Sequence, residues 1–316
     1  MINKFNNKSL KKILIYYLYG SLTINSFFYQ KDNHNNVTNI IEFFDDIFNT
    51  NYTNCKYELP VLGTFIPQGL CIVNDVVYIT AYDGKKEKNS VIFEITEDNS
   101  YRTIVLDTTA HVGGIAYDEI NNLFWVCDTN GTISSYDYED VIKNDYAISK
   151  SKKINVNDND LINHKGNASA AFISIFNNKI YIGNFSTDDN GILKCYELTN
   201  DGQINFETLK IYKIPNNVQG VTFYEYKNDT YILFSESYGR FKNSILEICL
   251  FDGNVTNYRN TYSLKYETPR MMEEIIIDDD NNLLMLFESN AYKYKNGLDD
   301  MDELQSIDIK RLIRNF

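Results

Sequence analysis

An all-β fold is predicted by three features of the 316-residue sequence. A unit of strand, turn and strand recurs five times from residue 66 onward, with equivalent positions roughly 50 residues apart. Asn or Asp stands at the turn of every copy, and both tolerate the positive φ of tight hairpins. Apolar periodicity typical of long helices is absent over this region. Four short strands per repeat indicate a single β-propeller.

The strands of the five copies can be placed from these features. The first two strands of each copy, with their turn, are expected at 66–84, 111–131, 169–186, 218–239 and 272–290. The turns fall at Asn74-Asp75, Asn121-Asn122, Asn177-Asn178, Asn228-Asp229 and Asn281-Asn282. A third strand is expected at 90–98, 131–140, 191–199, 244–253 and 291–297. A fourth is expected at 101–107, 151–156, 207–214 and 260–266.

The blade number follows from an anchor residue near the start of each copy. The anchors are Gly69, Gly114, Phe172, Gly220 and Glu274. Five anchors predict five blades, whereas six blades, the alternative, would need another copy within residues 1–55, where we find no anchor. We expect strands from the two ends of the chain to close the ring, with 55–62 or 305–313 completing the last blade.

The chain before the repeats divides into two segments. Four lysines in the first twelve residues precede a short apolar stretch, the pattern of a secretory signal peptide. We therefore predict a signal peptide or N-terminal anchor at 1–29, a polar linker at 30–54 and the propeller at 55–316. The expected location is extracellular or at the cell surface, with the cytoplasm as the alternative.

Composition excludes several classes of function. The chain has 43 acidic and 30 basic residues and a formal net charge of -13, which argues against nucleic-acid binding, since phosphate contacts need clustered Lys and Arg. No apolar run of about 18 residues follows the N-terminus, so the only membrane contact expected is an N-terminal anchor. The five cysteines form no CxxC pair and read as buried thiols. Phosphate-loop, dinucleotide, zinc-protease and nucleophile-elbow motifs are absent.

The blade topology predicts where a site must lie. Residues just before the first strand and just after the second strand of each blade share one face, at the mouth of the central channel. Loops on one face of a rigid scaffold commonly carry function. This mouth is expected to collect several carboxylates together with one of the three histidines of the chain, His111.

Two positions in this mouth point to catalysis. His111 stands directly before Gly113-Gly114 and could act as a general base or metal ligand, or else hydrogen-bond a neighbouring blade. Glu274 occupies a position that is small or apolar in the other blades, so its carboxylate is predicted to point at the axis without a packing role. We name His111 and Glu274 as the candidate catalytic residues.

A metal site and a ligand site are predicted from the same mouth. A ring of acids and amides suits Ca²⁺, which takes six to eight oxygen ligands, and the candidate metal ligands are Glu273, Glu274, Glu288 and Asn184. A solvated acidic rim is the alternative. The candidate ligand-binding residues are Gln68, Tyr82, Gln219, Tyr238 and Arg240. Tyr238 and Arg240 flank Gly239 in a loop that could hold a carboxylate or a sugar.

A resemblance to known proteins rests on six motifs spaced one blade apart over residues 57–297: PQG, HVGG, VQG, SYGR, MMEE and FES. In this order they resemble a family of uncharacterised, mostly exported bacterial β-propeller proteins. The third blade departs most, with Asn167-Ala168-Ser169-Ala170 at its start. More distantly, the chain is similar to lactonase-like and NHL-type propellers, and this resemblance implies a central Ca²⁺ and either lactone hydrolysis or binding alone.

Two main functions are consistent with these residues. The first is an exported monomer that binds a small polar ligand, a sugar or an organic acid, in its acidic mouth. The second is a Ca²⁺-dependent hydrolase of the lactonase type, in which His111 activates water and the metal polarises a carbonyl. A scaffold that binds another protein through blade edges is a third option. The sequence leaves open whether the protein is an enzyme.

Overall fold

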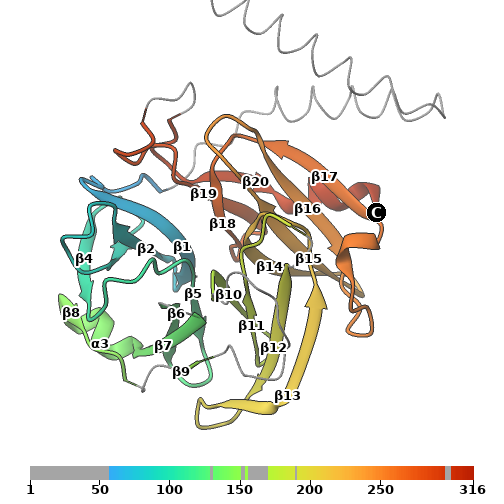
Figure 1. Ribbon diagram of the computed structural model, residues 1–316, viewed down its shortest axis with the longest axis horizontal. Coiled ribbons are helices and arrows are strands. Elements are labelled where there is room, and N and C mark those ends of the chain that lie inside the picture. The colour runs from blue at the N-terminus through green and yellow to red at the C-terminus, as the bar shows by residue number, and fades with distance from the viewer. Residues whose placement is uncertain (1–56, 129–130, 151–153, 156–169, 189–190, 296–299) are drawn as a thin grey trace, which may run out of the picture. The chain divides into compact units, whose positions relative to one another are not determined.

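A computed structural model describes residues 57–128, 131–150, 154–155, 170–188, 191–295 and 300–316. The described residues belong to one compact unit, Tyr52–Phe316. They form five antiparallel sheets arranged round a common centre, so the protein is a five-bladed β-propeller as predicted (Figure 1). The predicted signal peptide and linker lie outside the described residues. None of the described helices is long and apolar enough to cross a membrane.

The first two blades are built from β1 to β9. Blade 1 consists of β1 (Phe65–Val73), β2 (Val76–Asp83), β3 (Val91–Ile95) and β4 (Tyr101–Leu106). Blade 2 consists of β5 (Ile115–Asp118), β6 (Leu123–Cys127), β7 (Thr132–Asp137) and β9 (Ile154–Asn155). A two-residue strand, β8 (Tyr146–Ala147), adds to the outer edge of blade 1 by pairing parallel with β4.

The next two blades have four strands each. Blade 3 consists of β10 (Phe172–Phe176), β11 (Lys179–Gly183), β12 (Ile192–Leu198) and β13 (Ile204–Lys213). Blade 4 consists of β14 (Val218–Tyr226), β15 (Asp229–Glu236), β16 (Ser244–Leu250) and β17 (Ser263–Thr268). The turn between β14 and β15 lies at Lys227-Asn228, one residue earlier than predicted, because Tyr226 pairs with Asp229 and Lys227 takes the positive φ.

The last blade closes the ring in a way that the sequence predicted only in part. It consists of β18 (Met272–Ile277), β19 (Asn282–Phe287) and β20 (Gln305–Asp308). The predicted third strand at 291–297 is wrong, because β20 pairs with β19 and the described residues 291–295 form turns. Glu58 then bridges Glu303, so both ends of the chain complete the blade. Helices α4 (Ile309–Leu312) and η3 (Ile313–Asn315) end the chain.

The innermost strands β1, β5, β10, β14 and β18 contact their neighbours all the way round the centre (Figure 1). Buried apolar clusters fill the interfaces between adjacent blades: Tyr78 and Phe124 between blades 1 and 2, and Trp125 and Ile180 between blades 2 and 3. Similar clusters join blades 3 and 4, and blades 5 and 1. Consecutive residues of a strand face opposite neighbours, so each blade contributes to two interfaces. The four described cysteines are free and buried in these layers.

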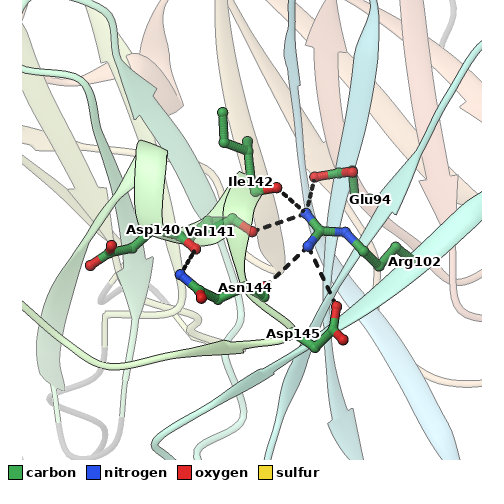
Figure 2. A network of polar contacts seen from close by, with 7 residues as sticks. All are labelled: Glu94, Arg102, Asp140, Val141, Ile142, Asn144 and Asp145. Carbon is green, nitrogen blue, oxygen red and sulfur yellow. Dashed lines mark hydrogen bonds and ion pairs between the residues drawn. The ribbon is translucent and has the colours of Figure 1, made fainter.

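One polar network fastens an insertion of blade 2 to blade 1. Helix α3 (Tyr138–Lys143) follows β7 and leads to β8. Arg102 on β4 reaches the C-terminal end of this helix (Figure 2). Its guanidinium contacts the carboxylates of Glu94 at 2.8 Å and Asp145 at 3.5 Å, and the carbonyls of Val141, Ile142 and Asn144 at 3.0, 3.0 and 3.1 Å. A cation that caps the last carbonyls of a helix stabilises it.

A short 3-10 helix, η2 (Tyr258–Asn260), links β16 to β17 and joins blade 4 to blade 3. Arg259 donates from Nε to Ile214 O at 2.6 Å and from Nη2 to Gly191 O at 2.9 Å. The buried Tyr258 lies in the apolar cluster between these two blades.

Candidate functional site

β-Bulges near the start of three inner strands shape the mouth. The strand pairing shifts between Pro67 and Leu70 in β1, between Val218 and Gly220 in β14, and between Met272 and Ile275 in β18. Gln68, Gln219 and Glu273 lie within these bulges. An extra residue in one strand bends it and redirects its side chains, which is why bulges are common at barrel rims and beside active sites. The bulges therefore place three sequence-predicted residues at equivalent points of blades 1, 4 and 5.

Close approach between neighbouring blades explains the small anchor residues. A Cβ on Gly69 would lie 2.6 Å from Ile115 N, and one on Gly114 would lie 2.8 Å from Ile173 N. The hydroxyl of Thr80 accepts from Gly69 N at 2.9 Å and donates to Val112 O at 2.8 Å, which ties the bulge of blade 1 to blade 2. Glycine is needed at these anchors because the backbone of the next blade occupies the position of a side chain.

A pair of hydrogen-bonded carboxyl groups forms the centre of the site. Glu273 on β18 is 5% exposed and makes a side-chain hydrogen bond with Glu288, which follows β19. Gln68 Nε2 of blade 1 donates to Glu288 Oε2 at 3.3 Å and to Pro67 O at 2.7 Å. The pair thus joins the last blade to the first. Two carboxyl groups in contact share a proton, since both cannot be ionised at this distance.

The two members of this pair differ in their protonation. Burial raises the pKa of Glu273 well above its ordinary value, and the neighbouring charge of Glu288 adds to this effect. Burial also raises the pKa of Glu288, to about 7, against the lowering effect of its hydrogen bonds to Glu273 and Gln68 and of nearby Lys293 and Arg240. Glu273 therefore carries the shared proton and donates it to the Glu288 carboxylate.

Tyr82 and His111 come together beside this pair. Their rings lie 4.2 Å apart between centroids with an interplanar angle of 31°. Burial raises the pKa of Tyr82, which also hydrogen-bonds with Tyr294. The His111 side chain is exposed at the mouth. Partial desolvation by the surrounding groups, with the positive charges of Lys293 and Lys86, lowers the pKa of His111 below its ordinary value of 6.5. The imidazole is therefore neutral at neutral pH and can accept or donate a hydrogen bond.

The SYGR loop after β15 supplies the remaining predicted ligand contacts. The Arg240 guanidinium lies over the ring of Tyr294 at 4.8 Å, and its charge acts on Glu288. The loop is held from below by the buried Arg270, whose Nη1 donates to Arg240 O at 3.1 Å. Tyr238 is 58% exposed and its ring lies 6.2 Å from that of Phe185. Gly239 takes a φ of 84°, the left-handed conformation that glycine allows at such a turn.

The other predicted residues lie apart from the pair or serve the fold. Asn184 Oδ1 accepts from Ile192 N at 2.7 Å, within blade 3. Glu274 was expected to point at the axis without a packing role, but its carboxyl fills the space beside Gly220, where a Cβ would lie 2.0 Å from Glu274 Oε1. Gln219 is partly buried within the bulge of β14.

Calcium does not fit the four predicted ligands as they are arranged. Glu273 and Glu288 bond to each other, Glu274 Oε1 accepts from Ile275 N at 3.0 Å, and Asn184 Oδ1 is taken by a backbone N–H. Among the described residues, no group of three or more His, Cys, Asp or Glu side chains is placed to hold a metal ion.

A thermal melt tests the Ca²⁺ site that the sequence predicts. We expect the melting midpoint of the protein to be the same in EDTA and in excess Ca²⁺, because no shared set of oxygen ligands is formed. A cation bound only by the native state at a hundredfold excess over its Kd would stabilise the fold by about 2.7 kcal/mol. A midpoint that rises with Ca²⁺ and not with Mg²⁺ would contradict this expectation and revive the hydrolase hypothesis.

Sequence reasoning missed two residues of the site, Lys293 and Tyr294. They follow β19 in the segment predicted as a strand, whereas Tyr294 N donates to Ala291 O at 2.8 Å in a turn. That turn brings Tyr294 to Tyr82 and Arg240, and Lys293 to His111 and Glu288. The alternation of Tyr and Lys at 292–295 was a visible signal, but it is also the pattern of a half-exposed strand.

Solved structures similar to this chain are known at low sequence identity. No protein-family model matches the chain, and no curated protein matches it. Similar solved structures include the PQQ-bound aldose sugar dehydrogenase of Streptomyces coelicolor (TM-score 0.48, 12% identity, covering 79% of this chain and 96% of that one). Another similar structure is an α-L-arabinofuranosidase of Clostridium thermocellum (TM-score 0.48, 11% identity, covering 77% of this chain and 87% of that one). The WD40 β-propeller domain of Doa1 is also similar (TM-score 0.41, 10% identity, 75% and 83%).

The raised pKa values predict how stability depends on pH. Glu288, with a pKa of about 7, and Glu236, raised to about 8 by burial and by its neighbour Glu247, hold protons that the unfolded chain releases above about 4.5. Their stabilising contribution is present below that pH and is lost as the pH rises through 7 and 8. His111 acts in the opposite sense, but only below 6.5. We expect the free energy of unfolding to fall by roughly 2 kcal/mol between about pH 6.5 and 8.

Urea unfolding at several pH values in that window measures this change. Glu288→Gln should reduce the pH dependence without abolishing it, since the amide does not titrate but Glu236 still does, and Glu207→Gln, on an exposed outer strand, should leave it unchanged. A stability that is constant or rises over the same window would contradict the protonation assigned to the two carboxyl groups.

Proposed function

We propose that the protein binds a small polar ligand, a sugar or a hydroxylated organic acid, in the axial mouth. The observation that carries the proposal is the Glu273–Glu288 pair with Gln68 Nε2 at 3.3 Å from it. The proton of Glu273 and the N–H groups of Gln68 are already used within the cluster, so what the cluster offers a ligand is acceptor oxygens. Hydroxyl groups of a ligand can donate to these oxygens, and the neutral His111 beside them can donate or accept in turn.

Aromatic side chains around the pair support a ligand with an apolar face. The tilted rings of Tyr82 and His111 lie beside it, and Arg240 lies over the ring of Tyr294. Tyr292 is 43% exposed and its ring lies 3.2 Å from the position of a Cβ on Gly84 in blade 1. Aromatic rings with a polar edge suit ligands that combine C–H faces and hydroxyl groups. The mouth therefore provides stacking surfaces as well as polar contacts.

Two basic residues near the pair would favour an organic acid over a neutral sugar. Arg240 and Lys293 both act on Glu288, in a chain whose net charge is -13. A ligand carboxylate would pair with Arg240 in a charge-assisted hydrogen bond, whereas a neutral sugar would contact the acid pair alone. The side chain of Arg240 is exposed, so it can turn from Tyr294 to a ligand.

Isothermal titration calorimetry with glucose, galactose, glucuronate and gluconate tests the proposal. We expect at least one of them to bind, and Glu288→Gln to weaken that binding at least tenfold, because the amide replaces an acceptor by a donor. Glu207→Gln is the matched control on the outer edge of blade 3. Arg240→Ala should weaken binding of the acids only. If none of the four binds, or if Glu288→Gln binds as well as the wild type, the mouth is not the binding site for this ligand class.

A further inference from the structure

Three loops on one side of the mouth are basic and exposed. They follow the second strands of blades 1, 4 and 5 and span 84–89, 238–243 and 291–295. Their seven Lys and Arg residues are all exposed, and Glu87 is the single acid among them. The corresponding segments of blades 2 and 3, 128–131 and 184–190, contain no Lys or Arg. Although the chain has a net charge of -13, its mouth therefore has one basic side.

One cation from each of these loops reaches the site. Arg240 and Lys293 both lie over the ring of Tyr294, at 4.8 and 5.1 Å from its centroid. The charge of Lys293 acts on both His111 and Glu288. Arg240 acts on Glu288, and Lys86 acts on His111. The three charges therefore form a cation row that runs along the mouth from Arg240 past Lys293 to Lys86.

The cation row has no acid to neutralise it. Among the described residues, Lys86, Arg240 and Lys293 take part in no ion pair. The carboxyl of Glu288 is already bonded within the acid pair. Below Arg240, the guanidinium of Arg270 is buried, and its Nε and Nη2 have no hydrogen-bond partner in the described part of the chain. Unpaired cations gathered at one mouth attract anionic ligands and raise their local concentration.

We propose that the mouth takes a hydroxylated dicarboxylate, with one carboxylate at Arg240 and the other between Lys293 and Lys86. This inference rests on the proposed function, because the hydroxyl groups between the two carboxylates donate to the oxygens of the Glu273–Glu288 pair. Arg holds a carboxylate through two parallel N–H groups, whereas Lys acts as a point charge. A diacid uses both ends of the cation row, a monoacid uses one end, and a neutral sugar uses neither.

Three acids with the same six-carbon chain test the proposal by calorimetric titration of the full chain. Gluconate has hydroxyl groups and one carboxylate, glucarate has hydroxyl groups and two carboxylates, and adipate has two carboxylates and no hydroxyl group. We expect glucarate to bind about tenfold more tightly than gluconate, or better, since a hydrogen bond to a charged group contributes about this factor. The affinity for glucarate should also fall more steeply with ionic strength, because exposed charges are screened by salt.

Adipate separates this proposal from the proposed function. We expect it to bind more weakly than glucarate, because it has no hydroxyl group for the acid pair. Equal affinities of adipate and glucarate would contradict the hydroxyl contacts of the proposed function. A glucarate affinity no higher than that of gluconate would contradict only the second carboxylate site, and no binding of glucarate would overturn the proposal as a whole.

Variants then locate the second carboxylate. Lys86→Ala and Lys293→Ala should each reduce the preference for glucarate over gluconate, since each removes one of the two cations at that end of the row. Lys210→Ala is the matched control, at an exposed position on the outer strand of blade 3, and should keep the preference. A thermal melt confirms that each variant is folded. An unchanged preference in both Lys86→Ala and Lys293→Ala would show that the second carboxylate does not bind between these lysines.

Discussion

Gly69→Ala is expected to destabilise the protein by roughly 3 kcal/mol, at the upper end of the effects of overpacking. The new Cβ would lie 2.6 Å from Ile115 N and 2.7 Å from the carbonyl carbon of Gly114. These are backbone atoms of blade 2, so they cannot move aside by a change of rotamer. Blades 1 and 2 must separate, and the hydrogen bond from Gly69 N to Thr80 Oγ1 is disturbed with them.

Gly253→Ala is the matched control for this substitution. No atom lies within 4 Å of its added Cβ, and its φ is not in the left-handed region. We expect a change within about 0.5 kcal/mol, as at other exposed positions. Urea unfolding followed by circular dichroism compares the two variants. Because Gln68 precedes Gly69 in the same bulge, Gly69→Ala should also weaken ligand binding in the mouth. Equal stability of the two alanine variants would contradict the close contact between the blades.

Trp125→Ala is expected to cost about 4 kcal/mol, the range for removing a large aromatic side chain from a core. Trp125 is the single tryptophan of the chain, is 1% exposed and packs between blades 2 and 3 with Ile173 and Ile180. The substitution removes a whole indole ring from a packed interior. A small movement of the neighbouring side chains could not fill the cavity that it leaves. The interface between two blades would lose most of its contact area at that point.

Trp125→Phe should cost much less, within about 1.5 kcal/mol. The indole Nε1 of Trp125 is buried without a hydrogen-bond partner among the described residues, and phenylalanine removes this unpaired donor together with part of the volume. Phe241→Ala, at a residue that is 82% exposed, serves as the surface control. Circular dichroism melts in urea measure all three, since the variants at position 125 lack tryptophan fluorescence. A loss below about 1 kcal/mol for Trp125→Ala would contradict its place in the core.

Local signals allowed most of the fold to be predicted. The Asn-Asp and Asn-Asn signals placed the turns of blades 1, 2 and 3, because positive φ is a property of single residues, and Asn74, Asn122 and Asn177 adopt it. The turns of blades 4 and 5 begin earlier than predicted, since Lys227 takes that conformation in place of Asn228 and Asn282 already belongs to β19. The third strand of blade 5 was misplaced, because a strand and a half-exposed turn segment have the same alternation of Tyr and Lys. The strand that pairs with β19 is β20, which lies further along the chain.

The sequence predicted on which face of the propeller the candidate site lies. It did not predict which side chains contact each other there. Repeat topology alone placed Gln68, Tyr82, His111, Glu273 and Glu288 at one mouth, and the structure brings these residues together. Repeat topology did not indicate that Asn184 bonds within its own blade or that the Glu274 carboxyl packs beside Gly220. A bulge changes which way successive side chains point, and the repeat pattern contains no sign of it.

By itself, the sequence determined the class of fold, the number of blades, the hairpin turns and the end of the propeller that carries the polar groups. Each of these follows from residue-level preferences that recur in every copy. Only the tertiary structure decided the partners: the acid pair Glu273–Glu288, the approach of Lys293 and Tyr294, and the unpartnered oxygen of Glu274. These depend on how blades from distant parts of the chain close round one centre, because contacts between blades are set by packing and not by local propensity.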